Sequence, residues 1–235
     1  MPDHIAKAYD QDIAELKSLL AEMGGLAEEQ LANAIQALAK RDIALADDVI
    51  RNDQKLDELE RRIEEKAILT IAKRQPVALD LREIMVTIRI SSDIERIGDL
   101  AKNTAKRTHA ISEALPRKLS TGLARMGSMA QSQLTQVLDA YAQRDAEKGL
   151  AVWRSDEDLD SLYNSIFREL LTYMMEDPRN ISLCTHLLFG AKNLERIGDH
   201  TTNIAENIHY LVNGKAITEG RPKKDVTSMM RATGA

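Results

Sequence analysis

One short motif occurs twice in this chain, and the second copy lies 100 residues after the first. Residues 94–99 and residues 194–199 both contain the sequence Glu-Arg-Ile-Gly-Asp. Asn103 and Asn203 follow the two copies at matching positions. A duplication this specific predicts that the chain consists of two copies of one structural unit. It also predicts that each copy carries the same acidic site.

The duplication extends well beyond the motif. Arg41-Asp42 recurs as Arg144-Asp145, at an offset of 103 residues. The segment after residue 212 has no sustained apolar period and contains glycine, proline and lysine, so we expect a flexible C-terminal tail there. The expected units are a first repeat, a second repeat and this tail, with the boundaries 1–113, 114–212 and 213–235.

Apolar residues within each repeat recur every three or four positions, which is typical of amphipathic helices. The composition agrees, because the chain has only 11 Gly and 5 Pro. We predict an all-α fold with three long helices per repeat, at residues 5–39, 42–73, 77–112, 117–142, 145–175 and 179–212. Short connections imply antiparallel neighbours and helical bundles. Pro76 and Pro178 suit the first turn of a helix, where a missing N–H costs little.

The composition also excludes several classes of protein. The net charge is only −5 and aromatic residues make up 3%, so the basic stripes and stacking platforms of nucleic-acid-binding proteins are missing. No apolar run approaches the length of a membrane span, and no signal peptide is visible. The single cysteine, Cys184, cannot form an internal disulfide, and its apolar neighbours predict a small buried side chain. We therefore expect a cytoplasmic protein.

Each repeat contains two pairs of acidic residues that are candidate metal ligands. Glu95 and Asp99 are four residues apart and share one helix face, where like charges cost a few tenths of a kcal/mol. The preceding helix contributes Asp53 and Asp57 with the same spacing. The corresponding residues of the second repeat are Asp156, Asp160, Glu195 and Asp199.

The two acidic pairs of each repeat are expected to lie at the same height in the helical hairpin. Residues at equal distances from the turn of an antiparallel hairpin lie at the same height. Positions 53 and 99, like 57 and 95, centre on Pro76, the predicted turn. In the second repeat the centre falls between Asp177 and Pro178. Each repeat would therefore place four carboxylates at one level, although this argument does not fix the rotation of the helices.

Carboxylate and amide oxygens suit Mg²⁺, Ca²⁺ or Mn²⁺, and carboxylate-bridged iron is also possible. A purely structural alternative is that Arg96 and Arg196 balance the acids. Another alternative is a di-metal enzyme in a helical bundle, for which the step from Glu206 to His209 is the one supporting feature. No phosphate-binding glycine loop or catalytic nucleophile is recognisable, and we expect no catalytic activity.

Residues 92–99 and 193–206 together resemble the PhoU family, regulatory proteins of phosphate-specific transport. The resemblance covers residues 5–212 and implies two pseudo-symmetric three-helix bundles that assemble as a homodimer. It implies negative regulation of phosphate uptake and of the phosphate-starvation response. The implied partners are the ATPase of the phosphate ABC transporter and a sensor histidine kinase, so that membrane contact occurs only through them. The eight acidic residues would hold Fe, Mn, Mg or Zn; Lys106 stands where the second repeat has Glu206.

Overall fold

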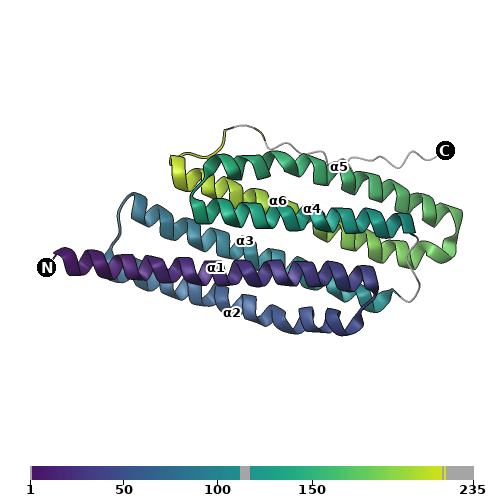
Figure 1. The fold of residues 1–235 in the computed structure, drawn as a ribbon, viewed down its shortest axis with the longest axis horizontal. Helices are drawn as coiled ribbons and strands as arrows, with labels where there is room; N and C mark the ends of the chain where they lie inside the picture. Colours follow the sequence, from purple (N-terminus) through teal and green to yellow (C-terminus); the bar gives the residue numbers. More distant parts are fainter. Residues whose placement is uncertain (1, 112–116, 219, 221–235) are drawn as a thin grey trace.

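The computed structural model describes residues 2–111, 117–218 and 220. This described part of the chain is almost entirely helical, as predicted (Figure 1). The elements are α1 (Pro2–Lys40), α2 (Ile43–Arg74), α3 (Leu79–Arg107), the short 3-10 helix η1 (Thr108–Ala110), α4 (Arg117–Gln143), α5 (Ala146–Glu176), the 3-10 helix η2 (Pro178–Asn180) and α6 (Ile181–Asn213).

The helices form two three-helix bundles that lie side by side, the first from α1 to α3 and the second from α4 to α6 (Figure 1). This arrangement confirms the predicted fold class. The bundles are joined by packing of α3 along α6 and of α1 against α4. A continuous core of apolar side chains runs through both, and it includes the buried Cys184. No helix within the described ranges is both long and apolar enough to cross a membrane.

One predicted boundary and most of the predicted tail cannot be compared with the structure. The boundary between the repeats, at 113 and 114, lies outside the described residues, as does most of the predicted tail. The described part of that tail begins as α6 ends, where Gly214 has a left-handed φ of 72°. The His209 imidazole hydrogen-bonds to the carbonyl oxygen of Lys215 at 3.0 Å, which ties the first residues after α6 back to the helix.

The repeated Arg-Asp pair forms the junction between the first two helices of each repeat. Arg41 and Arg144 end α1 and α4 in the left-handed region, with φ of 57° and 53°. The next residue then caps the following helix: the Asp42 carboxylate accepts a hydrogen bond from the backbone N–H of Leu45 at 3.0 Å, and Asp145 caps α5 in the same way. The duplicated dipeptide is thus explained by local backbone chemistry.

Replacing Arg41 by glycine should raise the free energy of unfolding by about 1 kcal/mol, because glycine adopts a positive φ without the steric cost that other residues carry. Urea unfolding of the purified variant measures the change. The matched control is Lys40→Gly, one residue earlier and still helical, which should be neutral or destabilising. An Arg41→Gly variant less stable than the Lys40→Gly variant would contradict the interpretation.

One prediction about the prolines was wrong. α3 begins only at Leu79, so Pro76 lies in the connection and not in the first helical turn. The chain reverses there through two residues with positive φ, Gln75 at 50° and Ala78 at 49°. Pro178 does occupy the first turn of a helix, the short η2 that leads into α6. The hairpin turns of the two repeats therefore differ locally although their helices match.

The contact between α1 and α4 has pseudo-twofold symmetry. A Cβ on Gly24 would lie 3.0 Å from Leu138 Cδ1, and a Cβ on Gly127 would lie 2.7 Å from Ile35 Cγ2. Gly127 and Leu138 stand 103 residues after Gly24 and Ile35, so the two contacts are the same contact made twice. The glycines let the two helices approach closely, because a side chain at either position would meet the partner repeat.

A partly buried carboxylate adds a polar link between the repeats. Glu83 of α3 pairs with Lys17 of α1 at 2.9 Å and with Arg144 at the junction of α4 and α5. Burial alone would raise the pKa of Glu83, but the hydrogen bonds from Arg144 and Lys17 outweigh it and hold the pKa below its usual value. Near this link, the hydroxyls of Thr87 and Tyr141 hydrogen-bond at 3.0 Å. Both bundles are thereby fixed in one relative register.

Candidate functional site

The predicted ligands of the first repeat lie on facing parts of α2 and α3. Asp53 is buried with 4% exposure, whereas Asp57, one turn further along α2, is exposed. The Glu95 side chain is 15% exposed and that of Asp99 is 32% exposed. Asp53 is close enough to Asp57 and Asp99 for their negative charges to raise its pKa, although burial is the larger cause. Asp53, Glu95 and Asp99 are therefore at least partly shielded from solvent, whereas Asp57 is not.

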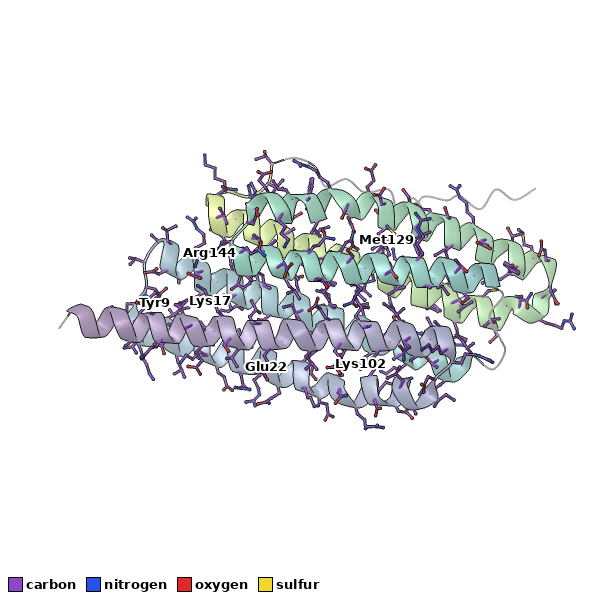
Figure 2. The ribbon with its side chains drawn as sticks, viewed as in Figure 1. Tyr9, Lys17, Glu22, Lys102, Met129 and Arg144 are labelled. Atoms are coloured by element: carbon purple, nitrogen blue, oxygen red, sulfur yellow. The ribbon has the colours of Figure 1, made fainter. Side chains whose placement is uncertain are left out.

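A lysine lies between two of these carboxylates. Lys102, which Figure 2 labels on the first bundle, donates from its ammonium to Asp99 Oδ1 at 2.6 Å and also to Asp53 Oδ2. Burial alone would lower the pKa of Lys102, but the hydrogen bonds to Asp53 and Asp99 raise it above its usual value. Lys102 is therefore a permanent cation that joins α3 to α2 inside the acidic cluster.

Glu95 carries the most perturbed carboxyl group of the cluster. Burial raises its pKa to about 7, and the nearby charges of Asp99, Glu60 and Asp57 act in the same direction, while Arg96 opposes them. Glu60, one turn beyond Asp57 on α2, also has a raised pKa, chiefly because it is buried. The cluster thus holds more negative charge than its own cations balance, which is the environment that favours a bound cation.

Without metal, the stability of the protein should fall as the pH rises from about 4.5 to about 7 through the contribution of Glu95. In this window the folded state binds more protons at Glu95 than the unfolded state does, so unfolding becomes easier as protons are removed. Glu95→Gln removes this term. With a chelator present, the variant should match the wild type near pH 4 and exceed it by about 1–3 kcal/mol above pH 7.

The measurement is urea unfolding at a series of pH values. Glu22→Gln serves as the control, because Glu22 is exposed on α1. The control should follow the wild-type pH profile. A constant difference between Glu95→Gln and the wild type at every pH would contradict the assignment.

The second repeat places its predicted ligands deeper. Asp156 and Asp160 of α5 and Glu195 of α6 are 1–2% exposed, and only Asp199 is partly accessible. A lysine is present here too, but at a different position: Lys192, one turn before Glu195 on α6, pairs with it at 2.9 Å. The two sites have carboxylates at equivalent positions of the repeats, whereas their lysines stand at positions that are not equivalent.

The glycine of each motif lets a neighbouring helix approach the site. A Cβ on Gly198 would lie 2.6 Å from Asp156 Oδ1 and 3.2 Å from Gln133 Oε1. Both oxygens therefore lie close to α6 at Gly198. At the matching place in the first repeat, a Cβ on Gly98 would lie 3.6 Å from Gln30 Oε1. Gln30 and Gln133 are 103 residues apart and come from the first helix of each repeat. All three helices of a repeat therefore contribute to its site.

The chemistry of these donors fits a metal ion that prefers oxygen ligands. The Gln30 side chain is only 2% exposed, yet neither its amide nitrogen nor its oxygen has a hydrogen-bond partner among the described residues. A buried carboxamide without partners is costly, and a cation beside its oxygen would satisfy that oxygen. In their present positions, no three His, Cys, Asp or Glu side chains in residues 2–111, 117–218 and 220 converge closely enough to hold a metal ion.

The structural alternative, in which arginines balance the acids, receives little support from the distances. Arg96 Nε lies 3.5 Å from Glu95 Oε2, its Nη1 lies 3.8 Å from Asp99 Oδ2, and its side chain is 60% exposed. Such an exposed pair contributes little to stability. Arg196 is exposed as well. The lysines, and not the motif arginines, make the short contacts to the acids.

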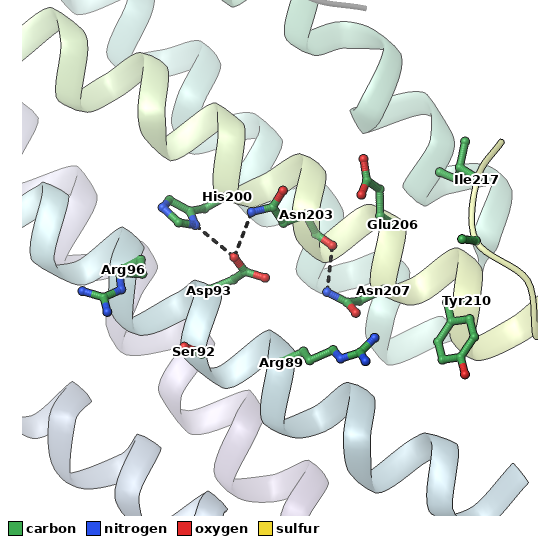
Figure 3. Close-up of a pocket in the computed structure, with 11 residues that line it drawn as sticks. Arg89, Ser92, Asp93, Arg96, His200, Asn203, Glu206, Asn207, Tyr210 and Ile217 are labelled. Carbon is green, nitrogen blue, oxygen red and sulfur yellow. Dashed lines mark hydrogen bonds and ion pairs between the residues drawn. The ribbon is translucent and has the colours of Figure 1, made fainter. Parts of the chain in front are cut away.

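A polar groove of about 860 Å³ lies between α3 and α6, beside both motifs (Figure 3). Asp93 accepts a hydrogen bond from Asn203 at 3.2 Å and lies 2.9 Å from His200 Nδ1. Arg89 and Arg96 line the same groove. These residues adjoin the motif residues on each helix, so the groove connects the outer surface with the region where the two repeats meet.

The features that suggested a di-metal enzyme have other roles. Glu206 accepts a hydrogen bond from the indole of Trp153 at 3.0 Å. His209 binds a backbone carbonyl after α6, as described above. His109, at the matching position of the first repeat, is 42% exposed and lies 3.0 Å from Asp47. These contacts give all three side chains structural partners within the fold.

Comparisons with known proteins match both repeats. The model of the PhoU domain matches residues 20–108 and again residues 123–208, so that each match contains one bundle's copy of the motif. The chain belongs to the PhoU family. A PhoU homolog of Rhizobium meliloti, named as a phosphate-specific transport system accessory protein, is 56% identical over 97% of this chain and 96% of its own length. A homolog with the same description from Caulobacter vibrioides is 51% identical over 97% of this chain and all of its own length.

Solved PhoU structures have the same fold. The crystal structure of PhoU from Pseudomonas aeruginosa superimposes with a TM-score of 0.85, at 39% identity, and covers 88% of this chain and all of the other. PhoU from Streptococcus pneumoniae, described as a phosphate transport system regulatory protein, gives a TM-score of 0.83 at 28% identity, covering 90% of this chain and all of the other. The resemblance seen in the motifs is thus confirmed along nearly the whole PhoU fold.

Four residues that the PhoU fold brings to its two candidate sites were not predicted from the sequence. Gln30 and Gln133 could have been found, because they recur at the same offset of 103 as the Arg-Asp junctions. Lys102 and Lys192 could not, since Thr202 and Ser92 stand at the matching positions. A search for repeated residues detects what the two halves share and overlooks what distinguishes them.

Proposed function

We propose that this protein is a cytoplasmic regulator of phosphate uptake that acts by binding other proteins. The observation that carries the proposal is that both repeats match proteins named as accessory or regulatory proteins of phosphate transport, over nearly the full length. Its partners would be the ATPase of the phosphate ABC transporter and a phosphate-sensing histidine kinase, and its effect would be negative when phosphate is plentiful. It would contact the membrane only through these partners and have no enzymatic activity.

Metal ions at the two carboxylate clusters form the second part of the proposal. The first would be held by Asp53, Asp57, Glu95 and Asp99 with Gln30, and the second by Asp156, Asp160, Glu195 and Asp199 with Gln133. Oxygen donors of this kind accept Fe, Mn, Mg or Zn ions. Such an ion would neutralise the excess carboxylates, satisfy the buried carboxamide oxygens and tie the three helices of a bundle together.

Two measurements test the regulatory role. Phosphate uptake should rise in phosphate-replete cells that lack the protein, and it should return to normal when the gene is restored. The tagged protein should also retain the transporter ATPase from extracts of phosphate-replete cells. Unchanged uptake together with no retained ATPase would refute the proposal.

We further propose that the protein acts as a homodimer. Sedimentation velocity at micromolar concentration distinguishes a particle of twice the chain mass of 26.2 kDa from a monomer. A monomer at all concentrations would refute this part, and it would leave the regulatory proposal to be judged by the uptake measurement.

A further inference from the structure

The two metal sites proposed above differ in how their charge is balanced, and the first repeat shows the clearest case. Its lysine bridges two helices: the Lys102 ammonium contacts Asp99 on its own helix, at 2.6 Å, and Asp53 across on α2. Both are proposed ligands, and Asp53 is nearly inaccessible to solvent. A metal ion that joined Asp53 to Asp99 would need the space that this ammonium occupies.

We propose that Lys102 is an internal competitor for the first-repeat metal site, which closes the site when no metal is bound and must move away when metal binds. The inference rests on the proposed metal sites and adds a residue that sets the affinity of one of them. It follows from position: an ammonium within hydrogen-bond distance of two ligand carboxylates and a metal ion between the same carboxylates exclude each other by volume and by charge.

The surroundings of Lys102 allow both states. Its side chain is 21% exposed, so the ammonium has a route to solvent along its flexible stem. The matched position in the second repeat has a threonine in place of this lysine. Thr202 there is fully buried, and its hydroxyl donates to the backbone carbonyl of Asp199 at 2.7 Å. The helix therefore accommodates a short polar residue at this place in the same motif.

Lys102 also explains why the Gln30 carboxamide lacks partners and why the carboxylates do not converge. Gln30 is buried beside Gly98 with both amide atoms lacking partners among the described residues, and the four carboxylates do not converge. With the lysine in place, the carboxylates turn to the ammonium, which leaves the carboxamide unsatisfied. Replacement of the ammonium by a cation with more coordination positions would engage the carboxylates and Gln30 together.

The test measures Mn²⁺ affinity at the first site alone. The second site is disabled with Glu195→Gln and Asp199→Asn, and free Mn²⁺ is followed by electron paramagnetic resonance during titration. Lys102→Met and Lys102→Thr should each bind Mn²⁺ at least about tenfold more tightly than the Lys102 parent, because a positive charge next to the ion has been removed. Lys102→Arg retains the charge and should not bind more tightly.

Lys106→Met controls for a simple loss of positive charge, because Lys106 is exposed one turn further along α3. It should change the affinity by less than about twofold, as expected for a screened surface charge. Circular dichroism of each variant verifies that the helices form, with and without Mn²⁺. Equal or weaker binding by both neutral Lys102 variants would overturn the inference.

A second experiment distinguishes failure of this inference from failure of the metal proposal on which it rests. The reciprocal background, with Glu95→Gln and Asp99→Asn, reports on the second site, which lacks a lysine at the matched position. If that site binds Mn²⁺ and Lys102 substitutions have no effect, only the role of Lys102 fails. If neither site binds Mn²⁺, or any of the other proposed ions, the metal proposal fails and the role of Lys102 fails with it.

Discussion

Gly98→Ala should destabilise the protein by up to about 2 kcal/mol, although alanine is the better helix former. A Cβ at this position would lie well inside van der Waals contact with Leu56 Cδ1, and Leu56 is completely buried. Overpacking of a core costs typically 1–3 kcal/mol, more than the roughly 1 kcal/mol that alanine returns in helix propensity. Urea unfolding in the presence of a chelator measures the effect without interference from metal.

The second motif glycine should give a comparable loss with an additional effect. In Gly198→Ala the new methyl group would lie 2.6 Å both from Leu159 Cδ2 and from Asp156 Oδ1, a proposed metal ligand. We therefore expect weaker metal binding in the second repeat together with lower stability. The matched control is Gly25→Ala, because Gly25 is exposed and a Cβ there meets nothing within 4 Å. It should raise stability by up to about 1 kcal/mol.

These variants separate close packing from helix propensity. If Gly98→Ala is as stable as the wild type, the two helices of the hairpin must be able to move apart at little cost. The explanation of the repeated glycine by close approach would then be wrong. If Gly25→Ala is destabilising too, the losses at Gly98 and Gly198 cannot be assigned to close packing.

The largest effect is expected when the carboxylates of both motifs are removed. A variant with Glu95→Gln, Asp99→Asn, Glu195→Gln and Asp199→Asn should purify without stoichiometric metal. It should also lose the stabilisation that metal gives the wild type, about 4 kcal/mol per site at a metal concentration a thousand times the dissociation constant. Elemental analysis and thermal unfolding with and without added metal measure the two effects.

The control for that variant has the same change in charge at exposed positions. Four surface glutamates are replaced by glutamine: Glu22, Glu29, Glu147 and Glu176. The control should retain its metal and the thermal shift that metal produces. If the motif variant retains as much metal as the control, the assigned residues are not the ligands.

The sequence predicted the helices and the level of the carboxylates because both depend on local spacing. Apolar periodicity sets the helices, and equal distances from a hairpin turn set the heights of Asp53 and Asp99. Exposure could not be predicted in this way. Asp57 is exposed whereas its counterpart Asp160 is 2% exposed, because the covering of these positions depends on tertiary packing and on how each helix is rotated about its axis.

The site residues that the sequence did not predict were missed for physical reasons too. Gln30 reaches the site from the first helix, which the hairpin argument did not place. Lys102 stands three residues after Asp99, a spacing that is common for ordinary surface ion pairs, so its second contact to Asp53 on α2 is visible only in three dimensions. The contact between Asp93 and His200 joins different repeats and has no signature within either one.

The pseudo-twofold contact between α1 and α4 has a consequence for how the sequence of the chain can evolve. Two identical subunits joined by a twofold axis must accept every substitution twice, once on each side. Here the same geometry joins two halves of one polypeptide, so the tether keeps the halves together while each accepts substitutions by itself. Lys102 in the first repeat and Thr202 at the equivalent position of the second are a difference that a symmetric pair of identical subunits could not have.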